Sequence, residues 1–112
     1  MAGTFELKKA KNGQFHFNLL AGNGQIVLTS EMYVARKSAE NGIASVQKNS
    51  GMDERYKKLV GKNGKFYFTL VAGNSQVIGQ SQMYTTEASR DAGIESVKNS
   101  GSTTTIKDST AD

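Results

Sequence analysis

Residues 11–19 read KNGQFHFNL, and residues 62–70 read KNGKFYFTL. At the same offset of 51 positions the correspondence extends over residues 11–46, where 18 of 36 positions are identical. Such internal similarity indicates a duplicated structural unit. A unit of about 50 residues is small for a hydrophobic core of its own. The chain is therefore predicted to be a single domain, residues 1–112, made of two repeats at about 3–54 and 55–108.

Each repeat is predicted to open with three short strands. Apolar and polar residues alternate over residues 5–8 and 14–19, which is the period of a half-buried strand. An Asn-Gly pair, typical of tight hairpin turns, separates the two segments. Residues 25–29 supply a third strand, and in the second repeat Gly79 departs from the pattern by replacing Leu28. The predicted arrangement is an antiparallel meander.

A helix is predicted after each meander. Ala39, Ile43 and Val46 are spaced at i, i+4 and i+7, so they lie on one helical face. The second helix is expected to be one residue shorter before its Asn-Ser-Gly end, and its inward face is expected to contain Ala88, Ala92, Ile94 and Val97. Gly42 and Gly93 interrupt both helices at the same place. An interior glycine costs about 1 kcal/mol relative to alanine, so its recurrence indicates close contact between helix and sheet.

The segments after the helices indicate how the repeats are joined. Residues 103–107, TTTIK, are rich in β-branched side chains and predict a last strand. In the first repeat, residues 53–57 run without a linker into the first strand of the second repeat. One strand is therefore expected to end the first repeat and to begin the second.

These motifs together resemble the YegP-like family of small, uncharacterised bacterial proteins. The resemblance rests on the doubled Asn-Gly-x-Phe-x-Phe strand, the Ala-Gly-Asn turn, the Ser-x-x-Tyr step and the Gly-Ile-x-Ser-Val helix, and it covers residues 3–108. It implies an α+β fold in which two tandem β-β-β-α-β repeats form one antiparallel sheet. It also implies that the repeats exchange their C-terminal strands and that two helices pack on one face. No catalytic or binding residue comes with the resemblance.

Composition limits the class of protein further. The chain has 14 Lys and Arg against 10 Asp and Glu, a formal net charge of +4, and it contains no cysteine. Without cysteine there is no disulfide, thiolate nucleophile or cysteine-bound zinc. No apolar run approaches the length of a membrane-spanning helix, and the first residues do not resemble a secretory signal. We expect a cytoplasmic monomer that does not interact with membranes.

The titratable residues do not indicate catalysis. His16 is the single histidine, and its counterpart in the second repeat is Tyr67. Its neighbours match neither a nucleophile elbow nor a metal-ligand spacing. The acidic residues are scattered and form no repeated pair. We therefore predict no catalytic residues, no metal ligands and no cofactor, and we expect that the protein is not an enzyme.

The Ser-x-x-Tyr step is the sharpest repeated polar motif, formed by Ser30 with Tyr33 and by Ser81 with Tyr84. One interpretation makes these four residues a twofold-related ligand patch. The other is structural: the methionines between them, Met32 and Met83, fill gaps in the core, and the hydroxyl groups bond to loop backbone. We favour the structural interpretation, because buried polar groups normally need such partners.

Two function hypotheses remain. The favoured one is a small structural or protein-interaction module, with an unknown partner. The alternative is weak binding of nucleic acid or another polyanion through an open, basic sheet face, because lysines gather near both hairpins and an aromatic residue could stack a base. The residues expected on that face are Lys8, His16, Asn18, Lys58, Lys65, Tyr67 and Thr69.

Overall fold

Two strand meanders, each followed by a helix, make up the structure, a computed structural model that describes residues 3–110. In the first repeat, β1 (Thr4–Lys9), β2 (Phe15–Leu20) and β3 (Ile26–Ser30) precede α1 (Arg36–Asn49). A 3₁₀ turn, η1 (Asp53–Arg55), leads into the second repeat. There β4 (Tyr56–Val60), β5 (Phe66–Val71) and β6 (Val77–Gln80) precede α2 (Glu87–Ser100), and β7 (Ile106–Asp108) ends the fold.

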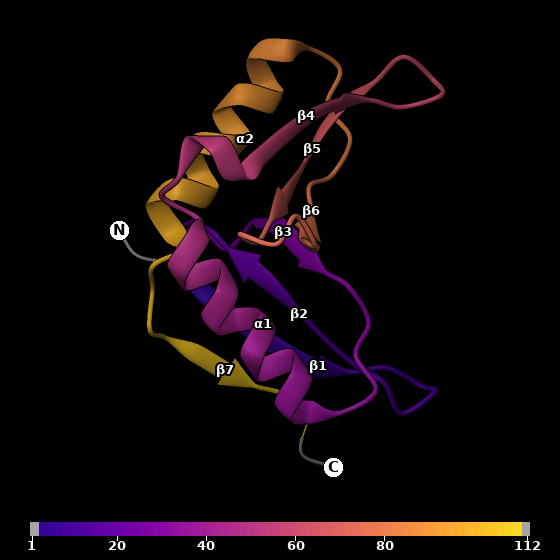
Figure 1. Cartoon of the computed structure of the whole chain (residues 1–112), viewed down its shortest axis with the longest axis vertical. Coiled ribbons are helices and arrows are strands. Elements are labelled where there is room, and N and C mark those ends of the chain that lie inside the picture. Colours follow the sequence, from indigo (N-terminus) through magenta and orange to yellow (C-terminus); the bar gives the residue numbers. More distant parts are fainter. Residues whose placement is uncertain (1–2, 111–112) are drawn as a thin grey trace.

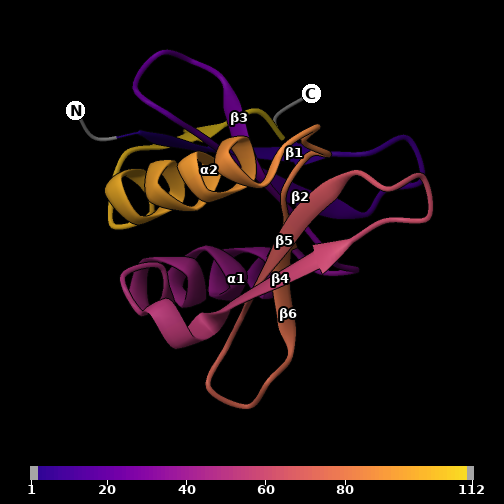
Figure 2. The ribbon, with the colours of Figure 1, turned by 90° about the horizontal axis from the view of Figure 1, so that it is seen from above.

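All seven strands form one sheet in the order β4-β5-β6-β3-β2-β1-β7. The two meanders meet where β3 pairs with β6, and both helices cover the same face of the sheet (Figure 2). The predicted α+β fold with two tandem repeats in one sheet is confirmed. One strand pair differs from the expected antiparallel pattern, because β7 runs parallel to β1, and the sheet is therefore mixed.

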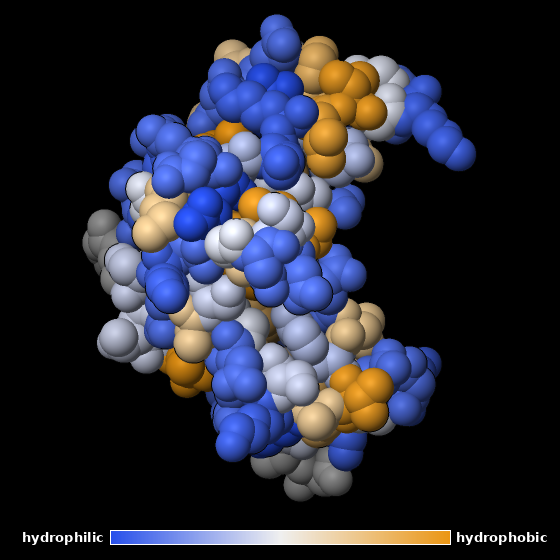
Figure 3. All heavy atoms as spheres, in the orientation of Figure 1, coloured by the Kyte–Doolittle hydropathy of each residue, from blue (hydrophilic) through white to orange (hydrophobic). Residues whose placement is uncertain are grey.

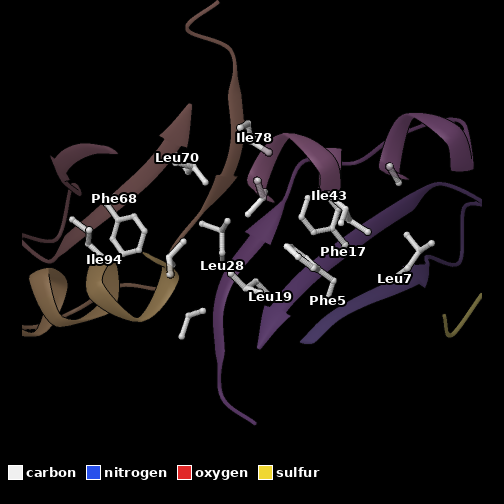
Figure 4. Close-up of a cluster of buried hydrophobic side chains, with 14 residues drawn as sticks. Phe5, Leu7, Phe17, Leu19, Leu28, Ile43, Phe68, Leu70, Ile78 and Ile94 are labelled. Carbon is white, nitrogen blue, oxygen red and sulfur yellow. The ribbon is translucent and has the colours of Figure 1, made fainter. Parts of the chain in front are cut away.

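The buried side chains form one cluster that spans both repeats. Phe17 and Ile43 lie at one end of this cluster, Phe68 and Ile94 lie at the other, and Leu28 lies between them (Figure 4). Burying a large apolar side chain contributes about 1.5–3 kcal/mol. The shared cluster therefore ties the stability of each repeat to that of the other.

The inward face of α2 differs from the expected one. Ala88 and Ala92 are exposed, and Arg90 is buried at the position that Ala39 occupies in the first repeat. The guanidinium of Arg90 lies over the ring of Phe66, 5.6 Å from its centre, which explains how a cation is accommodated there. As expected, α2 is one residue shorter than α1 before its Asn-Ser-Gly sequence, but both helices have 14 residues because α1 ends at Asn49 and α2 continues to Ser100.

Gly42 and Gly93 lie where each helix touches the sheet. A Cβ atom on Gly42 would lie 2.6 Å from the Tyr33 hydroxyl, and one on Gly93 would lie 2.4 Å from the Tyr84 hydroxyl. Both distances are far below van der Waals contact. The predicted close approach is confirmed, and the groups that require it are the two tyrosine rings.

The last strand crosses to the other repeat. β7 lies beside β1 at one end of the sheet, while β4 forms the opposite end (Figure 1). The Phe5 amide donates to the Thr105 carbonyl, and the Ser109 amide donates to the Leu7 carbonyl. Side chains of α1 hold the same segment, because Arg36 bonds to Asp108 and Gln47 donates to the Thr103 carbonyl. β7 therefore completes the first repeat.

Candidate interaction surfaces

The Ser-x-x-Tyr steps are built into the backbone where each meander ends. The Ser30 hydroxyl accepts a hydrogen bond from the Phe17 amide (2.8 Å) and donates to the Glu31 carbonyl (2.8 Å). Ser81 repeats this arrangement with the Phe68 amide (3.0 Å) and the Gln82 carbonyl. Each serine thus supplies the partner that a buried strand amide would otherwise lack.

The tyrosines and methionines of these steps behave differently from the structural expectation. The backbones of Tyr33 and Tyr84 bridge to Phe15 and Phe66, and the Tyr33 ring stacks on Phe17. Packing of their rings against the helices, and not the expected hydroxyl bonds to loop backbone, is what the structure shows. Met32 and Met83 are 46% and 44% exposed, so the expectation that they fill the core was wrong. That Ser30, Tyr33, Ser81 and Tyr84 have a structural role, and do not form a ligand patch, remains our proposal.

The sheet face opposite the helices is less basic than expected. Asn18 and Thr69 are buried in a polar row that crosses the central strands by way of Thr29 and Gln80. Lys8 lies opposite His16 in the strand register and pairs with Glu6 at 3.6 Å. Only two of the four central side chains in that row, those of Thr29 and Gln80, are exposed.

Lys58 does not lie on this open face. It stands opposite Phe68 in the register and forms an ion pair with Asp91 of α2 at 3.3 Å. The reason is the strand period, because Lys58 is the counterpart of the inward-facing Leu7. Lys65 and Tyr67 do lie on the open face, but three strands separate β5 from β1, which carries Lys8. The structure therefore does not gather the seven predicted residues into one patch.

Positive charge gathers instead on two hairpins, the one between β1 and β2 and the one between β4 and β5, and on neighbouring strands. Both hairpins project beyond the sheet on the side away from the helices, and the molecule is hollowed between them (Figure 3). Among residues 3–110, six lysines on the hairpins and the open face form no ion pair within 4.0 Å: Lys9, Lys11, Lys57, Lys62, Lys65 and Lys107. The acids of the helix side, by contrast, are mostly paired.

The outer edge of β4 is the second distinctive surface. In the first repeat, Phe5 and Leu7 point their backbone groups toward β7. Their counterparts, Tyr56 and Lys58, point away from β5, and within residues 3–110 no strand pairs with them on that side. Val60 on the same strand is 61% exposed. β4 is thus an open sheet edge in the described part of the chain.

A groove of about 470 Å³ lies between this edge and α2. Its apolar surface comes from Tyr56 and Ile94, and its charged residues are Asp53, Lys58, Asp91, Glu95 and Lys98. The groove occupies the place in the second repeat that β7 partly fills in the first. Sequence reasoning missed it, although the exchange of Leu7 for Lys58 between the repeats was a visible signal.

The charged groups of the groove form two local networks. Lys58 and Arg90 both contact Asp91 at 3.3 Å, and the hydrogen bond from Lys58 is the main cause that lowers the pKa of that carboxyl group. Lys98 bonds to Asp53 and to Glu95, and the bond to Asp53 is the main cause that raises the pKa of the lysine. Burial raises the pKa of the Tyr56 hydroxyl above its ordinary value. The cations of the groove are therefore already paired.

Within residues 3–110, no group of three His, Asp or Glu side chains lies close enough together to hold a metal ion. No helix in the same range is long and apolar enough to cross a membrane.

The fold and its edges define a class of small α+β protein in which two repeats share one sheet and the last strand of the second repeat completes the first. The chain belongs to the family described as "Domain of unknown function (DUF1508)", which matches residues 10–56 and 62–108. The two matches correspond to the two repeats, so the predicted tandem, YegP-like character is confirmed.

Similar proteins share nearly the whole chain. UPF0339 protein ACIAD0721 of Acinetobacter baylyi is 64% identical over 98% of this chain and 99% of its own length. UPF0339 protein YegP of Escherichia coli is 57% identical over 98% of this chain and all of its own length. The solution NMR structure of the E. coli protein, described as a protein of unknown function, has a TM-score of 0.95 at 56% identity and covers 100% of this chain and 97% of its own. The family is uncharacterised, so membership assigns no function.

Proposed function

We propose that the protein is a non-enzymatic, cytoplasmic module that acts as a monomer and binds other proteins at the edge of β4. One observation carries the proposal: β7 covers the outer edge of β1, whereas the equivalent edge of β4 is open in the described residues. An open edge presents unpaired amide and carbonyl groups that an extended segment of another protein can pair with.

The residues of β4 support binding there. Leu59 and Val60 are both exposed, at 37% and 61%, on a strand whose neighbour β5 is largely buried. The adjoining groove adds apolar surface from Tyr56 and Ile94. Lys57 and Lys58 are the kind of residue that protects an edge from aggregation. Their presence is consistent with an edge that pairs selectively.

A backbone substitution tests the proposal directly. In Lys58→Pro the amide that points away from β5 is removed, and proline is tolerated on an edge strand at such a position. Lys58→Ala is the matched control, because it loses the same side chain and keeps the amide. We expect wild type and Lys58→Ala, but not Lys58→Pro, to capture a protein from nuclease-treated lysate. Equal capture by all three proteins would contradict the proposal.

A second candidate function, polyanion binding, rests on the six lysines of the hairpins and the open face that form no ion pair. Phosphate contacts by such lysines would make affinity fall steeply with salt. We expect a single-stranded oligonucleotide at low salt to bind less well to Lys11→Gln/Lys62→Gln. Lys37→Gln/Lys48→Gln on α1 is the control with the same change in charge, and it should bind like wild type. Equal losses of affinity in both double variants would show that binding depends only on the net charge of the protein.

A further inference from the structure

We propose that the segment recognised by β4 is extended, runs parallel to β4 and is basic, with a Lys or Arg two residues after an apolar side chain that faces the groove. This inference rests on the proposed function and deepens it by naming the chemistry of the partner. It is drawn from a comparison of the occupied edge of the first repeat with the open edge of the second.

The direction of the segment follows from β7. β7 pairs in parallel with β1, with Ile106 opposite Phe5 and Asp108 opposite Leu7. At the offset of 51 residues, the same places on β4 are Tyr56 and Lys58. A segment that fills the equivalent position therefore runs parallel to β4 along its outer edge.

The start of the segment is set by a bond that the chain already makes. In the first repeat, the Phe5 amide donates to the Thr105 carbonyl. In the second, the Tyr56 amide donates to the Asp53 carbonyl within η1. The partner's ladder therefore begins at the Tyr56 carbonyl, beside the groove, and does not need to displace any part of the protein.

The apolar position corresponds to Ile106. Because Ile106 stands opposite the buried Phe5, its side chain shares the helix side of the sheet. The counterpart position on β4 stands opposite Tyr56, next to Ile94. An apolar side chain of the partner can thus cover the uncharged part of the groove.

The basic position corresponds to Asp108. In the first repeat Asp108 bonds to Arg36 at the start of α1. The counterpart of Arg36 is Glu87, whose side chain is 69% exposed and lies 4.0 Å from Arg90. An aspartate would therefore approach a carboxylate in the second repeat, whereas a lysine or arginine would approach an opposite charge.

The other charges near this position favour a cation as well. Lys58 faces the same site, but its ammonium group is held by Asp91, and Lys98 is held by Asp53 and Glu95. Arg90 is buried over Phe66. The carboxylates of Asp53, Glu87 and Glu95 are the most exposed charges here, at 82%, 69% and 66%. The accessible charge of the groove and of the adjoining start of α2 is thus acidic on a protein that is basic as a whole.

The chain supplies its own probes for the test. One peptide copies residues 102–110, STTTIKDST, and a second replaces Asp108 by lysine, STTTIKKST. Each is titrated into isotopically labelled full-length protein while the amide signals of Tyr56–Val60 are followed. We expect the lysine peptide to bind about fivefold more tightly than the copy, since exposed charge pairs contribute up to about 1 kcal/mol each. A third peptide with proline in place of Lys107 should not bind.

Variants of Glu87 separate the charge preference from strand addition. Glu87→Arg restores the arrangement of the first repeat, so the preference should reverse, and Glu87→Gln should abolish it. Equal binding of both peptides to wild type, with shifts at Tyr56–Val60, would overturn the basic preference and leave the proposed function standing. No shift at these amides with any peptide at about 1 mM, where an interaction of −4 kcal/mol would register, would overturn both.

Discussion

Leu28 and Gly79 occupy equivalent positions of the two repeats, yet they cannot carry the same side chain. They lie where β3 pairs with β6, next to the pseudo-twofold axis that relates the repeats. A Cβ on Gly79 would lie 2.8 Å from Leu28 Cγ and 3.0 Å from the Thr29 carbonyl oxygen. Leu28 fills the space for both repeats, and the glycine makes room for it.

We predict that Gly79→Ala lowers the free energy of unfolding by about 1–3 kcal/mol, the usual cost of overpacking. Gly51→Ala is the control, because no atom outside its chain neighbours lies within 4 Å of the added Cβ. Urea denaturation measures both. In a Leu28→Ala background the cost of Gly79→Ala should fall by at least half, since the clashing side chain is gone. The same cost in both backgrounds would show that Leu28 is not the cause.

One carboxylate, that of Asp108, contributes several bonds to the attachment of the short strand β7. Asp108 accepts hydrogen bonds from the Thr110 hydroxyl and amide and from Arg36. The bonds from Thr110, followed by that from Arg36, lower the pKa of Asp108 from 3.8 to about 2. All three residues of β7 are exposed, so these bonds and the ladder with β1 hold it in place.

Acid should weaken this attachment. Because the pKa of Asp108 is lower in the folded protein, its contribution to stability is complete above about pH 4 and is lost as the pH falls toward 2. We predict that Asp108→Asn is less stable than wild type at pH 6 and that most of this difference has disappeared near pH 2. Urea unfolding at several pH values measures the difference. A difference that does not change between pH 6 and 2 would mean that the carboxylate's charge is not what holds β7.

Removal of residues 102–112 should expose the edge of β1. We predict a lower melting temperature or association of chains through that edge, because an unpaired strand is a template for another. Thermal unfolding and size-exclusion chromatography measure the two outcomes. Added peptide STTTIKDST should restore part of the lost stability by filling the edge in trans. A monomeric truncated chain with unchanged melting would exclude a structural role for β7.

The whole molecule behaves as one core with two unequal ends. The buried cluster runs from Phe5 and Leu7 in the first repeat to Ile94 and Val97 in the second, without a polar boundary between them. At one end β7 covers the sheet, and at the other β4 is open. The two repeats therefore depend on one common core for their stability, but their outer sheet edges differ.

Substitution of one buried ring should reveal the shared stability. Phe68 is fully buried, so we predict that Phe68→Ala costs about 3–5 kcal/mol. Amide exchange should then speed up in β1 and β2 of the first repeat as much as in β5, because both repeats unfold together. Loss of protection confined to residues 55–108 would show that the repeats unfold separately.

Much of the fold could be predicted from the sequence, because it depends on local periodicity. The alternation in β1 and β2 and the spacing of Ala39, Ile43 and Val46 identify the inward faces whatever the strands pair with. The shift of 51 residues establishes the duplication. The recurrence of glycine at Gly42 and Gly93 indicated close packing without naming the tyrosines that cause it.

Only the tertiary structure decided how equivalent positions of the two repeats differ. Periodicity states which way a side chain points, but it does not state whether a strand has a neighbour on its outer edge. That is why the open edge of β4 was missed. The wrong face for Lys58 and the omission of Arg90 have another cause, since the offset of 51 residues already places them with the inward-facing Leu7 and Ala39. A duplicated sequence determines two similar units. Because the last strand can cover only one end of the shared sheet, the edge of β1 is covered and that of β4 is open in the described residues.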